Sequence, residues 1–208
     1  MVLAKMQSSH WAGKDLNVIE SYWSSPPATL RSKWFVEQLK NYQFNSIFEI
    51  GYFSGRNLKY IEEAFPESSI NGLEINKKAV EFAKAKLPKA ELMHMNLHDM
   101  HTVNKKYDIV FTSGVLIHVP PDEIPNVLLK CLDLSTGYVM HIESIGKGEV
   151  AAGPKHLKPT YKVSDQLQWN QDLVSIYKNI GFNVKVVKLP DECKTNGASE
   201  LVIINRNE

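Results

Sequence analysis

The sequence predicts an α/β fold: a doubly wound, mostly parallel seven-stranded sheet with helices on both faces and an antiparallel hairpin at the C-terminus. Short apolar runs alternate with segments of helical periodicity along most of the 208 residues. The run from Ile109 to Phe111 is bulky and uninterrupted, which is typical of a strand covered on both faces. The last two strand-like segments are joined by a loop too short for a helical crossover, so we expect them to pair antiparallel.

The first half of the chain contains a leading helix and two strand–turn–helix units. The leading helix begins at Pro27, a residue suited to a first helical turn. Pro66 and Pro88 end the two later helices, since proline cannot continue a helix. The predicted elements are strands at 46–50 and 69–75 and helices at 27–42, 58–65 and 76–87.

The second half continues the alternation and then changes to two consecutive strands. Its predicted strands are 90–95, 105–113, 137–144, 182–189 and 199–205, and its helices are 120–133 and one marked by Trp169, Leu173, Ile176 and Ile180. Gly181 ends that last helix.

The composition of the chain disfavours nucleic-acid and membrane partners. The 24 basic and 23 acidic residues nearly cancel, so no global field favours nucleic acid or an anionic membrane. No stretch approaches the ~20 apolar residues of a membrane span, and the N-terminus lacks a continuous apolar core. Cys131 and Cys193 have no CxxC spacing, which fits a reducing compartment. We therefore expect a cytoplasmic protein without a membrane partner, and nucleic acid is an unfavoured partner.

Two glycines follow the first predicted strand, in the segment FEIGYFSGRN from Phe48 to Asn57. A dinucleotide-binding turn requires G-x-G-x-x-G, but Phe53 and Arg56 stand at the second and third glycine positions. Glu49 precedes the turn, where a carboxylate repels phosphate and attracts a cation. Glu74 ends the next predicted strand, where a carboxylate can bind both hydroxyls of a ribose. The pattern predicts a ligand with a ribose and a positive charge but no phosphate.

S-adenosylmethionine fits this description, because it carries an ammonium, a sulfonium and a free ribose. FEIGYFSGRN resembles the glycine-rich first motif of the class I S-adenosylmethionine-dependent methyltransferases. LEIN, residues 73–76, resembles their ribose-binding acidic motif, and YDIVFTSGVLIHVP, residues 107–120, resembles their fourth motif and the segment after it. Three motifs in order are far more specific than one.

A narrower resemblance concerns the N-terminus and the fourth and fifth strands. HWAGKD at 10–15, TSGVLIHVPPDEIP at 112–125 and HIES at 141–144 are similar to small methyltransferases associated with pseudaminic acid and related surface-sugar biosynthesis.

The family resemblance implies a Rossmann-like domain with a defined cofactor site. Residues 45–208 would bind S-adenosylmethionine, and residues 1–44 would form a helical cap over the site, within a single domain. The implied cofactor-binding residues are Trp11, Glu49, Gly51, Tyr52, Gly55, Asn57, Glu74, Ile75, Asn96, Leu97 and Ser113. Asn96 stands where the family often has an aspartate for the adenine amino group, and Asp99 is the alternative for that role. Trp11 is either a lid over the cofactor or a docked core aromatic residue.

Two side chains are candidates for catalysis. Methyl transfer from a sulfonium is an in-line displacement that depends mainly on placement, and a base helps when the acceptor is a hydroxyl. His118 follows the fourth strand, and an imidazole with a pKa near ~6.5 suits that task. Its alternative role is to anchor the helix that begins at Pro120 or Pro121. Glu143, at the end of the fifth strand, is the second candidate.

The acceptor is expected to contact His118, Glu143, His156 and Tyr161. His156 and Tyr161 lie in the glycine-rich segment 145–163, which we interpret as an acceptor-binding loop. Its lysines could hold a phosphate or carboxylate of the acceptor, or could be solvated. No metal is predicted, because His94, His98 and His101 have no further ligand at a suitable spacing.

The sequence therefore predicts a methyltransferase that uses S-adenosylmethionine, releases S-adenosylhomocysteine and acts on a small-molecule acceptor. The expected acceptor is a sugar, a nucleotide sugar or a related metabolite, methylated on oxygen or nitrogen. Two alternatives stay open: a non-catalytic subunit of a larger complex with this fold, and a nucleic-acid methyltransferase. The sequence counts against the second alternative, because TSGV stands after the fourth strand in place of an N/D-P-P-Y/F-like sequence.

Overall fold

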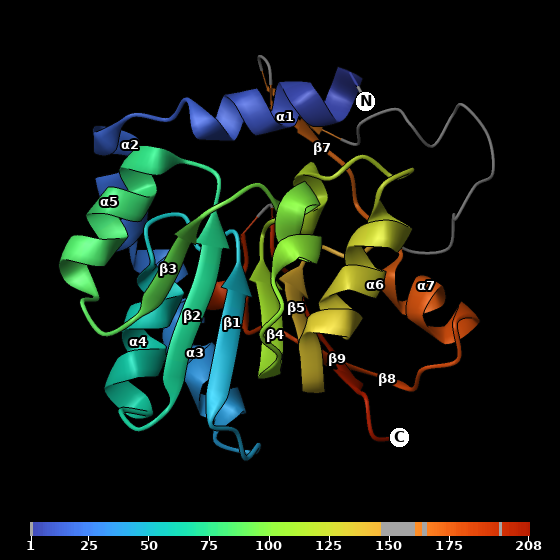
Figure 1. Cartoon of the computed structure of the whole chain (residues 1–208). Coiled ribbons are helices and arrows are strands. Elements are labelled where there is room, and N and C mark those ends of the chain that lie inside the picture. Colours follow the sequence, from blue (N-terminus) through green and yellow to red (C-terminus); the bar gives the residue numbers. More distant parts are fainter. Residues whose placement is uncertain (1, 147–160, 164–165, 196) are drawn as a thin grey trace.

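A seven-stranded sheet forms the centre of the protein (Figure 1). The structure, a computed structural model, describes residues 2–146, 161–163, 166–195 and 197–208. The strands lie in the order β3-β2-β1-β4-β5-β9-β8. They are β1 (Ser46–Ile50), β2 (Ser69–Glu74), β3 (Glu91–His94), β4 (Tyr107–Ser113), β5 (Ser135–Glu143), β8 (Val184–Lys188) and β9 (Glu200–Asn205).

The strand directions confirm the predicted fold class. The first five strands pair in parallel, and β9 lies antiparallel between β5 and β8. The predicted C-terminal hairpin is therefore confirmed. A small antiparallel pair, β6 (Tyr161–Val163) and β7 (Gln166–Gln168), was not predicted. Three-residue strands carry too few positions to show a period of two.

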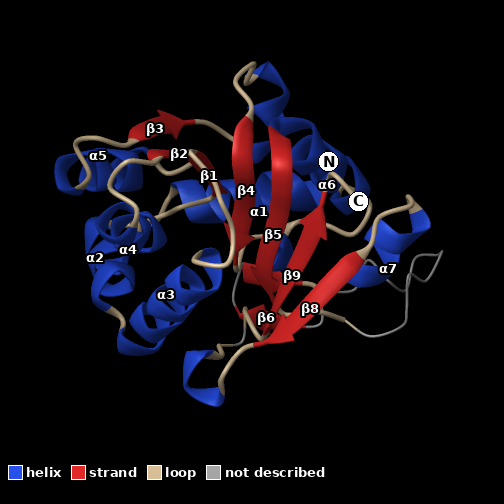
Figure 2. Cartoon of the chain, turned by 90° about the horizontal axis from the view of Figure 1, so that it is seen from below, coloured by secondary structure: helices blue, strands red, loops and turns tan. Residues whose placement is uncertain are grey.

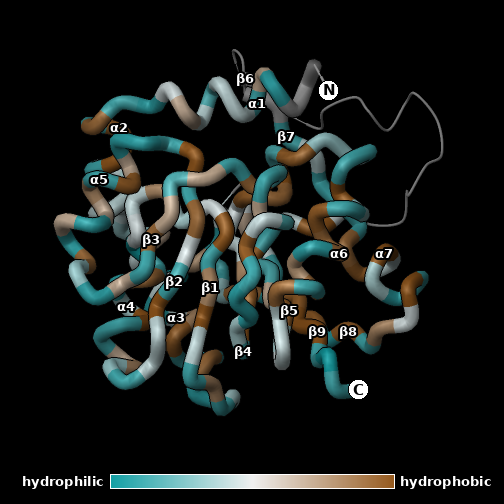
Figure 3. Tube along the Cα trace, in the orientation of Figure 1, coloured by the Kyte–Doolittle hydropathy of each residue, from teal (hydrophilic) through white to brown (hydrophobic). Residues whose placement is uncertain are grey.

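Helices cover both faces of the sheet (Figure 2). One apolar cluster joins the sheet to α3 (Pro26–Leu39), α4 (Arg56–Ala64) and α5 (Lys77–Lys86). The other joins it to α6 (Ile124–Leu134) and α7 (Leu173–Asn179). Hydrophobic residues follow β1 and β9 through the centre (Figure 3), and Ile47, Phe48 and Ile50 of β1 have no exposed surface. A strand buried on both sides reads as a continuous apolar run, which is why periodicity located β1 and β4 well.

The helices α6 and α7 begin later than the sequence predicts. Residues Leu116–His118 form a short 3₁₀ helix, η2, so α6 begins at Ile124 rather than Pro120. Trp169 precedes α7 instead of lying in it, and its buried side chain belongs to an extended segment whose backbone N–H bonds the Ile117 carbonyl at 2.8 Å. Trp169 fits the helical spacing of apolar residues, but an extended backbone buries its side chain equally well.

The N-terminal helices α1 (Val2–Ala12) and α2 (Leu16–Ser24) precede α3, and α1 lies across the carboxyl ends of the strands (Figure 1). The Asn76 side-chain amide donates to the carbonyls of Trp11 and Lys14, at 2.9 and 3.0 Å, which fixes the α1–α2 connection to the start of α5. A second tie is the ion pair between Lys78 and Asp15 at 2.7 Å. Among the described residues, no helix is both long and apolar enough to cross a membrane.

Candidate active site

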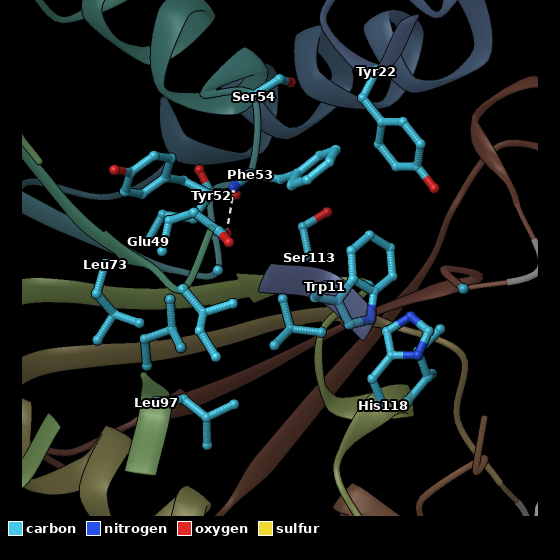
Figure 4. Close-up of a pocket in the computed structure, with 18 of the residues that line it drawn as sticks. Trp11, Tyr22, Glu49, Tyr52, Phe53, Ser54, Leu73, Leu97, Ser113 and His118 are labelled. Carbon is cyan, nitrogen blue, oxygen red and sulfur yellow. Dashed lines mark hydrogen bonds between the residues drawn. The ribbon is translucent and has the colours of Figure 1, made fainter. Parts of the chain in front are cut away.

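A cavity of about 870 Å³ lies at the carboxyl ends of β1, β2 and β4, below α1 (Figure 4). Its walls come from the turn after β1, the end of β2, the segment after β3 and the segment after β4. The strand order reverses between β1 and β4, which is where open α/β sheets bind ligands. Residues at or after the ends of four different strands therefore meet at one cavity.

The turn after β1 has the left-handed backbone that its glycines suggest. Gly51 has φ +73°, and a Cβ there would lie 2.8 Å from Val115 Cγ2, so no other residue fits without displacing the segment after β4. Gly55 has φ +80° and is the N-cap residue of α4, but it does not line the cavity. Phe53 has φ 45°, a conformation that costs a non-glycine residue free energy. The position of the second glycine in the G-x-G-x-x-G pattern is thus occupied by a residue with a left-handed backbone.

Glu49 is a buried carboxylate, and only one of its two oxygens accepts a hydrogen bond within the described protein. Its side chain is 1% exposed, and Oε1 accepts a hydrogen bond from Asn57 Nδ2 at 2.6 Å. Asn57 is held in turn by Ser32 Oγ, which donates to Asn57 Oδ1 at 2.6 Å. Glu49 Oε2 has no hydrogen-bond partner within the described protein, and the residue lines the cavity. Burial raises the pKa of Glu49 to about 7, against the opposing effects of the Asn57 hydrogen bond and the Arg56 charge. A cationic group in the cavity would satisfy the free oxygen and favour the ionised form.

Glu74 ends β2 on the other side of the turn. Its oxygens accept hydrogen bonds from the backbone N–H of Phe53 at 2.9 Å and of Asn76 at 2.7 Å. Burial raises its pKa to about 7, and backbone hydrogen bonds oppose that rise. Each carboxylate oxygen has a further lone pair, so Glu74 can also accept from a ligand hydroxyl. It therefore connects the turn after β1 to any ligand at the end of β2.

Asn96 and Leu97 line the cavity after β3, beside Ile75. Asn96 Oδ1 accepts from the His98 N–H at 3.1 Å and caps the 3₁₀ helix η1 (Leu97–Thr102), while its Nδ2 donates to Ser8 Oγ at 3.3 Å. The amide oxygen expected to bind an adenine amino group is thus already in use in this structure, although a carbonyl oxygen can accept twice. Asp99, the alternative, is not among the residues that line the cavity.

Four aromatic side chains from different elements meet across the cavity: Trp11, Tyr22, Phe53 and His118 (Figure 4). The Trp11 ring centroid lies 5.5 Å from that of Phe53 and 4.9 Å from that of His118, in edge-to-face geometry. Tyr22 and Phe53 are 5.0 Å apart in the same geometry. Trp11 thus bridges the turn after β1 and the segment after β4, in a position to cover a ligand between them.

The segment after β4 brings Ser113 and His118 to the cavity wall. Ser113 Oγ is buried and has no partner within the described protein. Glu143 does not lie with them: it is 1% exposed, does not line the cavity, and its Oε1 accepts from the Val115 N–H at 2.9 Å. The structure does not place Glu143 among the cavity-lining residues, and its predicted contact with the acceptor stays a prediction.

Most of the other predicted site residues line the cavity. Apart from Gly55, every predicted cofactor-binding residue lines the cavity. His156 lies outside the described residues, while Tyr161 belongs to β6 and pairs with Gln168, a cavity-lining residue.

The three histidines of β3 and η1 contact other groups of the protein. His94 Nε2 lies 2.9 Å from the Ile75 carbonyl, His98 Nε2 lies 3.4 Å from Glu123 Oε2, and His101 Nδ1 lies 3.1 Å from the His98 carbonyl. In the described part of the chain, no group of three His, Cys, Asp or Glu side chains is arranged to hold a metal ion.

Sequence reasoning missed Arg31. This α3 residue lines the cavity, is 7% exposed and donates from Nη1 to Thr195 Oγ1 at 2.8 Å, while Nε has no partner within the described protein. Burial lowers the pKa of Arg31, and the charges of Glu143 and Glu49 oppose that shift. A guanidinium here could bind a ligand carboxylate. The signal was present in the sequence, since Arg31 lies one helical turn before Phe35 on the apolar side of the predicted helix.

Comparison with known proteins agrees with this geometry. Residues 47–135 match the family model described as a methyltransferase domain. No curated protein matches the chain.

Solved structures show the fold. The magnesium protoporphyrin IX methyltransferase of Synechocystis PCC 6803 with bound SAM has a TM-score of 0.63 at 16% identity, over 96% of this chain and 89% of that one. The N-terminal domain of EvdMO1 with SAH and D-fucose has a TM-score of 0.61 at 20% identity, over 88% of this chain and 83% of that one. The plantazolicin methyltransferase BpumL, with SAH and a desmethyl plantazolicin analogue, has a TM-score of 0.66 at 13% identity, over 100% and 98%. These three structures, all at 20% identity or below, show the fold that this chain shares with them.

Proposed function

We propose that this chain, which carries a methyltransferase domain, transfers a methyl group from S-adenosylmethionine to a small polar acceptor. The observation that carries the proposal is the pair of buried carboxylates, Glu49 and Glu74, at the ends of adjacent strands on one cavity. In the described part of the chain no lysine lines that cavity. Two carboxylates disfavour a phosphate and favour a ligand with a ribose and an ammonium group.

Each part of the cofactor has a matching group on the wall. We assign Glu74 to the ribose hydroxyls, the free Oε2 of Glu49 to the ammonium and the free Nε of Arg31 to the carboxylate of the methionine part. Ile75, Asn96 and Leu97 supply the wall for the adenine. Bound there, the cofactor supplies an electrophilic methyl group on a positively charged sulfur.

The acceptor would occupy the part of the cavity bordered by Trp11, Tyr22 and the segment after β4. His118 lies there and would receive the proton of an acceptor hydroxyl or amine. Trp11 and Phe53 would cover the reacting atoms and exclude water. The whole cavity, about 870 Å³, is within the usual range for small-molecule sites of ~300–1,000 Å³.

For the acceptor we propose a sugar, a nucleotide sugar or a related surface-sugar precursor, methylated on oxygen or nitrogen. Aromatic side chains such as Trp11 and Tyr22 pack well against the apolar faces of sugar rings. The N-terminal domain of EvdMO1, similar in fold, is described with D-fucose. We further propose a cytoplasmic location, which fits the two free cysteines, Cys131 and Cys193.

The test is acceptor-dependent turnover. The purified protein is incubated with S-adenosylmethionine and a panel of sugars, nucleotide sugars and amines, and S-adenosylhomocysteine is measured. We expect product with at least one sugar-class acceptor, and turnover lost in His118→Ala while S-adenosylhomocysteine still binds. Cofactor binding without turnover on any acceptor would support the non-catalytic subunit instead.

A further inference from the structure

Four buried polar side chains connect helix α7 to the segment after β4. Tyr177 Oη lies 2.7 Å from His141 Nε2, and His141 Nδ1 lies 2.9 Å from Thr112 Oγ1. The Thr112 hydroxyl donates to Glu143 Oε1 at 2.8 Å. Each of the four is at most 1% exposed, and none of them lines the cavity. We call these four residues the buried chain.

The buried chain lies where packing alone favours apolar residues. Thr112 and His141 face each other on the adjacent central strands β4 and β5, and Glu143 follows two residues later on the same face. Their neighbours on that face include Val110 and Val139, which belong to an apolar cluster. Polar groups in such surroundings cost free energy unless all are paired, so their presence calls for a role beyond filling space.

The hydrogen bonds of the buried chain have one consistent direction. Burial lowers the pKa of His141 to about 3, so its ring is neutral near neutral pH and has a single N–H. The Thr112 proton is used by Glu143, so Thr112 Oγ1 must accept from Nδ1–H of His141. Nε2 is then the acceptor, and the Tyr177 hydroxyl donates to it. With Glu143 ionised, each proton has one place, which fixes the histidine tautomer and the rotamers of its neighbours.

The end of the buried chain holds the backbone of the cavity wall. Glu143 Oε1 also accepts from the Val115 N–H at 2.9 Å. Burial raises the pKa of Glu143 to about 7, and hydrogen bonds from the backbone N–H groups of Val115, Leu116 and Ile117 oppose that rise. The Gly114 N–H donates at 2.9 Å to the carbonyl of Ile142, the residue before Glu143 on β5. These contacts set the course of the backbone from the end of β4 through η2, whose last residue is His118.

We propose that the buried chain is a positioning device: it holds residues 113–118 so that His118 stays on the cavity wall, in line with an acceptor. Its members act through the backbone of this segment and do not touch the reacting groups. The consequence for methyl transfer rests on the proposed function, whereas the positioning of the segment does not. Loss of one link leaves the next group unpaired, so a change at Tyr177 reaches the cavity through His141 and Thr112.

The test is amide hydrogen exchange at Val115, measured by NMR in the whole protein. Thr112→Val removes the hydroxyl and keeps the shape, and we expect exchange at Val115 at least about ten-fold faster. Thr112→Ser restores the hydroxyl and should stay within about two-fold of the natural protein. Tyr177→Phe, at the far end, should also speed exchange at Val115 and should mix the two tautomers in the ¹⁵N spectrum of His141.

The control is Val139→Ala, which removes packing on β5 and keeps all four side chains of the buried chain. A purely structural role predicts that Thr112→Val speeds exchange throughout the core as Val139→Ala does, with no rescue by serine, and that outcome would overturn the proposal. Unchanged exchange at Val115 in Thr112→Val would also overturn it. Titration of each variant with S-adenosylhomocysteine separates the two ideas: a natural protein that binds none refutes the proposed function and leaves the exchange result standing.

Discussion

Ligand affinity should depend on the ionisation of Glu49. Its pKa is raised to about 7 because burial outweighs the Asn57 hydrogen bond. With that pKa, roughly a tenth of the molecules carry the carboxylate at about pH 6 and roughly nine tenths at about pH 8. If the free Oε2 binds the ligand ammonium, only the ionised form binds well, so the affinity should rise roughly ten-fold over this range.

The assay is calorimetric titration with S-adenosylhomocysteine at both pH values, for the natural protein and for Glu49→Gln. Glutamine keeps the shape and an oxygen for the Asn57 Nδ2 bond but cannot ionise. We expect the variant to bind at least about ten-fold more weakly at about pH 8, the usual effect of losing a hydrogen bond to a charged group. The difference between the two proteins should shrink toward about pH 6. The same pH slope in both would refute the role given to Glu49 and would point to Glu74, whose pKa is also raised to about 7.

Three further predictions concern the backbone, the base and stability. Gly51→Ala should abolish binding of S-adenosylhomocysteine, because φ is +73° and a Cβ would lie 2.8 Å from a Val115 methyl carbon; Gly181→Ala, with φ +94° and nothing within 4 Å, should cost only about 1 kcal/mol in urea unfolding. His118→Ala should leave that binding within about two-fold and lower kcat by at least about a hundred-fold, and equal losses in both would remove His118 as the base. The unliganded protein should become less stable in urea as pH rises from about 5 to about 8: a carboxyl such as that of Glu74, whose pKa is raised on folding to about 7, contributes stability below its unfolded pKa and loses it as pH passes the folded one. A flat profile would mean that such groups ionise freely in the folded state.

The sequence predicted the sheet because burial leaves a clear pattern. Central strands such as β1 and β4 are apolar on both faces, and prolines marked helix ends near Ala64 and Lys86. Spacing also located the cavity, since Gly51 and Glu74 end adjacent parallel strands. Such patterns show which positions within one strand or helix are buried and where that element ends.

Contacts between side chains far apart in the sequence could not be predicted from these local patterns. Glu143 stands at the end of a strand like Glu74, yet it accepts from the Thr112 hydroxyl and the Val115 N–H and does not line the cavity. Arg31 is a basic residue of α3 whose partner Thr195 is 164 positions away. The meeting of Trp11 with His118 depends on how α1 crosses the sheet, which no local period determines.

The central claim is that this cavity binds S-adenosylmethionine through Glu74. Its most direct test is calorimetric titration with S-adenosylmethionine and S-adenosylhomocysteine of the natural protein, Glu74→Ala and a matched control, Glu91→Ala, which removes an exposed carboxylate of β3 outside the cavity. We predict micromolar binding of both compounds by the natural protein and by Glu91→Ala, and loss of both in a folded Glu74→Ala. No binding of either compound by the natural protein, or equal binding by all three proteins, would contradict the account.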